Sequence, residues 1–278
     1  TAQPYREWLD NNLQRLNDTE TDDEHTLPDI QADELEVFEK MFGVSFEERD
    51  QVIRVLGEMG QEAVGSMGDD SPFAVMSQKV RSLYDYFRQQ FAQVTNPPID
   101  PLRENIVMSL ETCIGQERNL FEEGEDHAQR VVLDSPVLTE KLFKQVLALG
   151  DTDPEYKSYR ISLNYQPETG LENAIDAICA DAEQAVRNGH VVLVLSDRDI
   201  SRDTVPVHAL LATGAVHQHL IKAGLRCDAN LIVETATARD PHHFGVLLGY
   251  GATAIYPYLA YACLQDLRST NEIKDIEH

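Results

Sequence analysis

Short runs of β-branched residues recur along the second half of the chain, and this alternation constrains the fold more than any other feature. The runs are RVVLD, YRISLNY, HVVLVLS, NLIVET and ATAIY, which begin near residues 130, 159, 190, 230 and 252. Most of the intervals between them are about 30 to 40 residues, the length of a β-α-β unit. We therefore predict five βα units around a parallel sheet over residues 130–267.

The segments between these runs carry the signals of helix ends. Gly189 and Gly224 follow long apolar-periodic stretches, where a helix commonly ends in the left-handed conformation. Three prolines stand where helices commonly begin, in Asp153-Pro154, Val205-Pro206 and Asp240-Pro241. Five units are fewer than the eight of a closed TIM barrel, which takes roughly 250 residues. The predicted fold class is therefore α/β, with an incomplete, rudimentary TIM-barrel-like sheet.

Residues 1 to about 120 show helical signals only. PYREWLDNNLQRL predicts an amphipathic helix, and FEERDQVIRVLGEMG predicts another that ends at Gly60. In DDSPFAVMSQKVRSLYDYFRQQFAQV, Ser71 and Pro72 predict the start of a long helix. We divide the chain into a helix and acidic linker (1–40), a helical region (41–125) and a βα-repeat region (126–278), together forming one unit.

The charge of the chain excludes several classes of partner. The formal net charge is -25, and the stretch Asn17–Glu39 contains no Lys or Arg, which is typical of a solvated linker. Such a charge repels nucleic acid and anionic membrane surfaces. No apolar run approaches the roughly 18 to 20 residues of a membrane helix, and the start lacks a secretory signal. A cytoplasmic location is expected.

The cysteines and histidines do not have metal-site spacing. The four cysteines are far apart with no C-x-x-C pair, so we expect buried, reduced thiols. His217 and His219, like His242 and His243, match no H-E-x-x-H motif and are expected to have structural or hydrogen-bonding roles. Metal-binding residues are predicted to be absent.

The best local candidate for a site lies where two predicted strands end. Ligands of parallel sheets bind outside the carboxyl ends of the strands. Asp197, Arg198 and Asp199 follow the most apolar run, and Glu234 ends the next one. Asp197, Asp199 and Glu234 could share a metal ion or perform acid and base chemistry. Alternatively, they are the polar residues with which strands leave a sheet and helices are capped.

Three longer stretches point to a known family. They are GSMGDDSPFAVMSQKVRSLYDYFRQQFAQVTNPPIDPLRE, LLATGAVHQHLIKAGLR and HHFGVLLGYGATAIYPYLA. In this order they resemble the central domain of the large (alpha) subunit of glutamate synthase, and the resemblance spans nearly the entire chain. It implies a connecting domain of an oxidoreductase of glutamate biosynthesis, ammonia assimilation and nitrogen metabolism.

The resemblance implies that the family's catalytic and cofactor-binding residues lie in other domains or subunits. The family's glutaminase domain uses an N-terminal cysteine, whereas this chain starts with Thr1. Its FMN and [3Fe-4S] motifs have no counterpart here, and FAD and NADPH belong to a small electron-delivering partner subunit. We therefore expect no catalytic or cofactor-binding residue in this chain, and flanking glutaminase and FMN-binding domains as partners.

One proline-rich joint has a further expected role. Thr95, Asn96, Pro97, Pro98 and Ile99 form a stretch in which several φ angles are fixed, so ordering it costs little entropy. We expect it to face the neighbouring domains and to shape the path of ammonia; an ordinary rigid connection is the alternative. The competing function for the whole chain is a free-standing βα enzyme that acts on a small anionic substrate at the strand ends.

Overall fold

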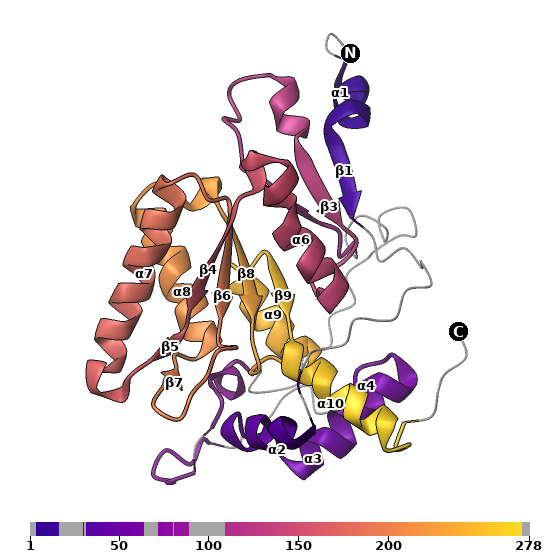
Figure 1. Cartoon of the computed structure of the whole chain (residues 1–278), viewed down its shortest axis with the longest axis vertical. Helices are drawn as coiled ribbons and strands as arrows, with labels where there is room; N and C mark the ends of the chain where they lie inside the picture. Colours follow the sequence, from indigo (N-terminus) through magenta and orange to yellow (C-terminus); the bar gives the residue numbers. More distant parts are fainter. Residues whose placement is uncertain are drawn as a thin grey trace.

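The protein is an α/β structure built on a four-stranded parallel sheet (Figure 1). The computed structural model describes residues 4–16, 30, 32–63, 72–79, 81–88 and 109–273. The strands of the main sheet lie in chain order: β4 (Ser158–Ser162), β6 (Val192–Ser196), β8 (Asn230–Glu234) and β9 (Ala254–Tyr256). All three neighbouring pairs are parallel. Four of the five predicted strands are thus confirmed in one parallel sheet.

The first predicted strand belongs to a different sheet. β3 (Arg130–Leu133) pairs in parallel with β1 (Leu13–Leu16) and antiparallel with β2 (Thr112–Ile114). Only the residues after β3 reach the main sheet, where the Leu138 amide donates to the Ile255 carbonyl at 2.8 Å. The prediction of five strands in one sheet is therefore wrong for β3, because the polar turn that contains Pro136 separates β3 from the segment that pairs with β9.

Helices follow the strands as predicted, with two differences in where they begin. They are α6 (Glu140–Thr152), α7 (Leu171–Arg187), α8 (Ala209–Lys222), α9 (Pro241–Gly249) and α10 (Tyr258–Ser269). Asp240 caps α9 as expected, and Gly189 and Gly224 have φ of 86° and 71° after α7 and α8. Val205–Pro206, however, forms β7, which pairs with β5 (Asn164–Tyr165), and α8 begins only after His208.

Short 3-10 helices lie in several of the connections. They are η2 (Leu83–Tyr86), η3 (Glu125–Ala128), η4 (Pro154–Tyr156), η5 (Pro167–Thr169) and η6 (Arg226–Asp228). Asp153-Pro154, predicted to open a helix, therefore opens only the single turn η4, in which the Asp153 side chain accepts from the Glu155 amide.

The N-terminal part is less helical than the sequence predicts. Its helices are α1 (Tyr5–Asn12), α2 (Ala32–Met41), α3 (Phe46–Glu48), the π-helical turn η1 (Arg49–Ile53) and α4 (Arg54–Met59). Gly60, with φ of 59°, ends α4 as predicted. The expectation of helices alone is wrong, because β1 and β2 lie in this part.

The long helix predicted from Ser71 is also wrong in the residues that can be compared. Residues 72–79 and 81–88 contain no α-helix, only η2. Val75 and Met76, which belong to its predicted apolar face, are exposed, whereas Tyr84 is fully buried. Burial of Tyr84 among side chains from the rest of the fold thus outweighs the helical pattern of the segment.

The core lies on both faces of the main sheet. In β6, Leu193 and Leu195 face a cluster that includes α7 and α8, whereas Val192 and Val194 face one that includes β3, α6 and α10. Leu35 and Ile53 belong to this second cluster. In Figure 1, α2, α3 and α4 accordingly lie beside α10. The N-terminal helices therefore share their core with the sheet.

Candidate functional site

The polar residues at the carboxyl ends of β6 and β8 lie next to each other. Ser196 is paired with Glu234 in the strand register, and the Asp197 amide donates to the Glu234 carbonyl at 3.2 Å. Ser196, Asp197, Glu234 and Thr235 are all buried. The sequence-predicted candidates Asp197 and Glu234 are thus brought to one edge of the sheet, within the fold rather than on its surface.

Asp197 is surrounded by hydrogen-bond donors of the protein itself. Its Oδ1 accepts from the Tyr258 hydroxyl at 2.8 Å, and its Oδ2 accepts from the Thr235 hydroxyl at 2.5 Å. The Ala236 amide donates to Oδ1 at 3.1 Å. Burial raises the pKa of Asp197 to about 6, and these hydrogen bonds oppose the rise. Both carboxylate oxygens are occupied, as a buried polar group requires.

Glu234 is held by a separate set of donors. Its Oε2 accepts from the Ser196 hydroxyl at 2.7 Å and forms an ion pair with the guanidinium of Arg160. Arg160 comes from β4 and also donates to the Ser196 Oγ at 2.9 Å. Each residue of this triad comes from a different strand, so the side chain of Arg160 in the middle of β4 is tied to the carboxyl ends of β6 and β8.

The other two predicted residues point to different surroundings. The Arg198 guanidinium lies 4.5 Å from the centroid of the Tyr258 ring, a cation–π arrangement. Asp199 is exposed. Within the described ranges, no group of three or more His, Cys, Asp and Glu side chains could hold a metal ion. The four candidates therefore do not converge on one shared point.

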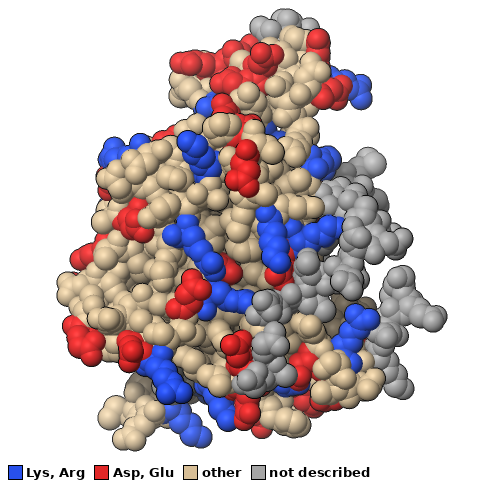
Figure 2. Space-filling model, in the orientation of Figure 1, with Lys and Arg blue, Asp and Glu red and all other residues tan. Residues whose placement is uncertain are grey.

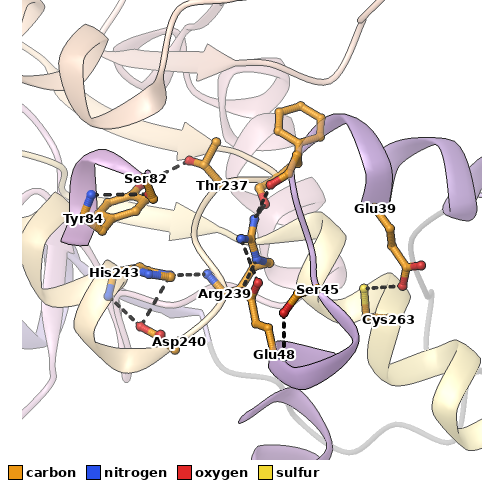
Figure 3. Close-up of polar contacts among 12 residues, drawn as sticks. Glu39, Ser45, Glu48, Ser82, Tyr84, Thr237, Arg239, Asp240, His243 and Cys263 are labelled. Carbon is orange, nitrogen blue, oxygen red and sulfur yellow. Dashed lines mark hydrogen bonds and ion pairs between the residues drawn. The ribbon is translucent and has the colours of Figure 1, made fainter. Parts of the chain in front are cut away.

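A second polar centre, which the sequence did not reveal, is built around Arg239 (Figure 3). Arg239 is 8% exposed and follows β8. Its Nε and Nη2 donate to the two carboxylate oxygens of Glu48 in α3, at 2.6 and 3.1 Å. Its Nη1 donates to the Ala236 carbonyl at 2.9 Å. This two-pronged ion pair attaches the N-terminal helices to the end of the sheet.

Neutral histidines surround this centre on the other side. The Arg239 amide donates to His243 Nδ1 at 3.2 Å, and the ring of Tyr84 lies between His243 and His208, with centroids 4.4 and 5.0 Å away. Burial lowers the pKa of His243 to about 3 and that of His208 to about 4, and the charge of Arg239 adds to both effects. The predicted hydrogen-bonding role of His243 is confirmed.

A third link joins the N-terminal helices to α10. Arg49 forms ion pairs with Glu39 and with Asp266 of α10. The Cys263 thiol donates to Glu39 Oε1 at 3.4 Å, and burial raises the pKa of Cys263 to about 12. The expectation of buried thiols is confirmed for Cys263 and Cys179 but wrong for Cys113 and Cys227, which are exposed.

Comparison with known proteins decides the family. The family model described as "Glutamate synthase central domain" matches residues 38–278. The chain belongs to the glutamate synthase central domain family. The match includes the sheet, the Asp197 and Glu234 networks, and α3 with its Arg239 partner.

Relatives of this glutamate synthase domain come from plants, bacteria and yeast. The chain is 42% identical over 98% of its length to a chloroplastic ferredoxin-dependent glutamate synthase of Oryza sativa. It is 40% identical over 94% to the large chain of the NADPH glutamate synthase of Bacillus subtilis, and 38% identical over 97% to the NADH glutamate synthase of Schizosaccharomyces pombe. It spans 17, 17 and 13% of their lengths.

Thr95–Ile99, the predicted interdomain joint, lies outside the described residues. In the space-filling view, several Lys and Arg side chains lie together in the middle of one face, and most of the Asp and Glu side chains lie toward its edges (Figure 2). The described helices include none that is long and apolar enough to cross a membrane.

Proposed function

We propose that this chain is the connecting domain of a glutamate synthase large chain and is not itself catalytic. Its role is to hold the glutaminase domain and the FMN-binding synthase domain in register, so that ammonia passes internally between them. The parent reaction converts L-glutamine, 2-oxoglutarate and a reductant into two L-glutamate molecules. The observation that carries the proposal is the family match over residues 38–278, in relatives six to eight times longer than this chain.

The polar centres support a structural role for this domain. Asp197 and Glu234 accept hydrogen bonds from groups of the protein itself, and the Arg239 guanidinium donates to Glu48 and to backbone carbonyls. A buried polar network that is satisfied internally fixes one arrangement of the surrounding elements. Such rigidity is what a spacer between two coupled sites needs. The free-standing βα enzyme is not favoured, because the relatives are named as glutamate synthases.

The parent's cofactors are best assigned to the rest of the polypeptide and to its partner. An iron–sulfur cluster needs several cysteine thiolates close together. Here Cys179 and Cys263 belong to different core clusters, and the high pKa of Cys263 keeps its thiol protonated. The residues present therefore do not fit a [3Fe-4S] cluster. We assign FMN to the synthase domain, and FAD with NADPH to the small electron-delivering subunit.

Three finer expectations belong to the same proposal. The parallel order β4-β6-β8-β9 supports an incomplete, TIM-barrel-like sheet. The regions 1–40, 41–125 and 126–278 act as one unit, supported by the core that Leu35 and Ile53 share with β6. The reductant is proposed to be NADPH, which the Bacillus subtilis relative's name includes; other relatives are named for ferredoxin or NADH. The location is proposed to be cytoplasmic, whereas the Oryza sativa relative is named as chloroplastic.

The proposal is tested first with the purified 278-residue chain. It is expected to be colourless and to show no turnover with glutamine, or with 2-oxoglutarate, ammonia and a reductant. A stoichiometric flavin, a tightly bound metal, or turnover in either half-reaction would refute the non-catalytic assignment.

The role of the joint is tested in the full-length enzyme. Replacement of Pro97 and Pro98 by Ala frees the φ angles of this stretch. We expect glutamine hydrolysis to exceed glutamate formation from 2-oxoglutarate in the double variant, because ammonia escapes. The matched control is Pro154→Ala in the exposed turn η4, which should leave the ratio unchanged. A constant ratio in both variants would remove Thr95–Ile99 from the ammonia path.

A further inference from the structure

A groove opens between the segment that contains η2 and helix α8. Its volume is about 610 Å³, and none of the described residues that line it is Asp, Glu, Lys or Arg. We call it the η2–α8 groove and define it by Leu83, Tyr86, Phe87, Leu211, His217 and Tyr250. A groove without a charged residue is notable in a chain of which 26% is charged. Interfaces are depleted in charge at their centre and enriched in aromatic residues.

The side chains of the groove expose large apolar areas. Tyr86 is 55% exposed, Tyr250 42% and Leu211 37%. Leu83 and Phe87, from the segment that contains η2, pack on the core cluster that also contains α8. Exposed apolar surface that is gathered in a groove marks an interaction site more often than a random surface does.

The walls of the groove are fixed by close packing. The rings of Phe87 and Tyr250 meet edge to face, with centroids 5.3 Å apart. A Cβ atom at Gly214 of α8 would lie 2.9 Å from the Tyr250 ring, so the helix and the ring approach as closely as glycine allows. A surface that is ordered before binding loses little entropy on binding. The groove is therefore suited to receive a partner without rearrangement.

One groove-lining ring has a fixed donor. Arg226 donates from Nε to His217 Nδ1 at 2.9 Å and from Nη2 to the Gly251 carbonyl at 2.8 Å. Because Nδ1 accepts a hydrogen bond, the neutral ring keeps its proton on Nε2. His217 thus keeps an N–H donor on Nε2 beside the leucine and aromatic side chains of the groove. This combination favours an occupant with apolar side chains and an accepting carbonyl or hydroxyl.

We propose that the η2–α8 groove is the docking site for an apolar segment contributed by another domain of the same glutamate synthase polypeptide. This inference rests on the proposed connecting function. Relatives that match this chain carry it as 13 to 17% of their length, so most of their polypeptide is available as a neighbour. A second copy is disfavoured because both chains would carry a net charge of -25, and such self-repulsion opposes association.

The test compares two positions of α8 in the full-length enzyme. Leu211→Cys places a thiol in the groove, and Ile221→Cys places one outside it, at a residue that is 48% exposed. The exposed Cys113 and Cys227 are replaced by Ser in both variants. Maleimide labelling is followed by mass spectrometry of the peptides that contain each position. We expect labelling at position 211 to be at least about tenfold slower than at position 221, since docking must open first.

The same pair is then labelled in the 278-residue chain alone. There we expect the two rates to agree within about threefold, because no other domain is present. Equal rates in the full-length enzyme would overturn the proposal. Protection of position 211 in the short chain would overturn it too, since the chain's own residues would then cover the groove. Protection that grows with protein concentration would indicate a second copy instead.

Failure of the groove proposal can be told apart from failure of the connecting function. Equal labelling, together with an inactive and colourless 278-residue chain, rejects the groove and leaves the connecting role standing. Turnover by the short chain rejects the connecting role whatever the labelling shows. Leu211→Asp provides a second reading: in the full-length enzyme it should raise the labelling of native cysteines or the proteolysis rate, whereas Ile221→Asp should not.

Discussion

The ion pair between Arg239 and Glu48 should contribute strongly to stability, and a double-mutant cycle can measure it. The perturbations are Glu48→Gln, Arg239→Met and both together. Gln keeps the shape of Glu48 and one accepting oxygen, but it removes the charge and turns an NH2 group toward the guanidinium. Met replaces Arg239 with an apolar chain of similar length. The cycle isolates the interaction from the separate effects of each substitution.

The magnitude follows from the burial of the two side chains. Arg239 is 8% and Glu48 20% exposed, and two charge-assisted hydrogen bonds join them. Removing one partner of a fully buried pair costs about 3 to 5 kcal/mol. Because a fifth of Glu48 is in contact with water, we expect about 2 to 3 kcal/mol for Glu48→Gln. The coupling energy between the two positions should be about 2 kcal/mol.

Urea unfolding of the 278-residue chain supplies the free energies, and thermal unfolding provides a check. A loss of about 2 to 3 kcal/mol should lower Tm by roughly 4 to 12 °C. The control is Glu36→Gln in α2, whose partner Lys40 forms an exposed ion pair with side-chain exposures near three quarters. It should cause no measurable change. A coupling energy below about 0.5 kcal/mol would refute the role of Arg239 as an anchor of the N-terminal helices.

Two further predictions concern the sheet and the turn before β9. Asp197 has a pKa of about 6 in the folded protein against an ordinary value of 3.8, so the folded state holds this proton more tightly. The free energy of unfolding of the wild type, relative to Asp197→Asn, should therefore fall by roughly 2 to 2.5 kcal/mol as the pH rises from 4 to 7. Unfolding curves that differ by a constant amount across this range would contradict the assignment. Gly251→Ala should lower the free energy of unfolding by at least about 2 kcal/mol, because φ is 107° and the added Cβ would lie 2.2 Å from His217 Nδ1. The control is Gly249→Ala in α9, where an added Cβ meets nothing within 4 Å; this substitution should be neutral or slightly stabilising. Equal effects of the two substitutions on urea unfolding would show that the turn is not constrained.

The parts of the fold that could be predicted are those whose signals are local. The run Val191–Leu195 is apolar throughout because both faces of β6 are covered, and this reads directly from sequence. The start of α9 could be predicted because Asp240 and Pro241 act on the helix that they begin. In the candidate site, adjacency of Asp197 and Glu234 followed from the rule that parallel strands end at one edge.

The parts that could not be predicted depend on distant contacts. Arg239 and Glu48 are separated by 191 residues, and no local sequence pattern at either position predicts that they pair. β1 lies 117 residues before its partner β3 in the register Leu13 to Arg130, and its four residues looked like the end of a helix. The segment around Tyr84 has helical periodicity, but its buried place between His208 and His243 decides its conformation.

The backbone hydrogen bond between Leu138 and Ile255 affects how the chain folds during its synthesis. The edge of the main sheet is completed by a segment that precedes all four of its strands, and α10, the last helix, packs against α2 near the start. A ribosome releases residues at about 5 to 20 per second, so the early segments wait several seconds for their partners. During that time Leu35 and Leu138 lack the apolar contacts that β9 and α10 provide in the folded protein. A chaperone would meet the nascent protein at these two places, and a chain that terminates before residue 254 should never become protease-resistant.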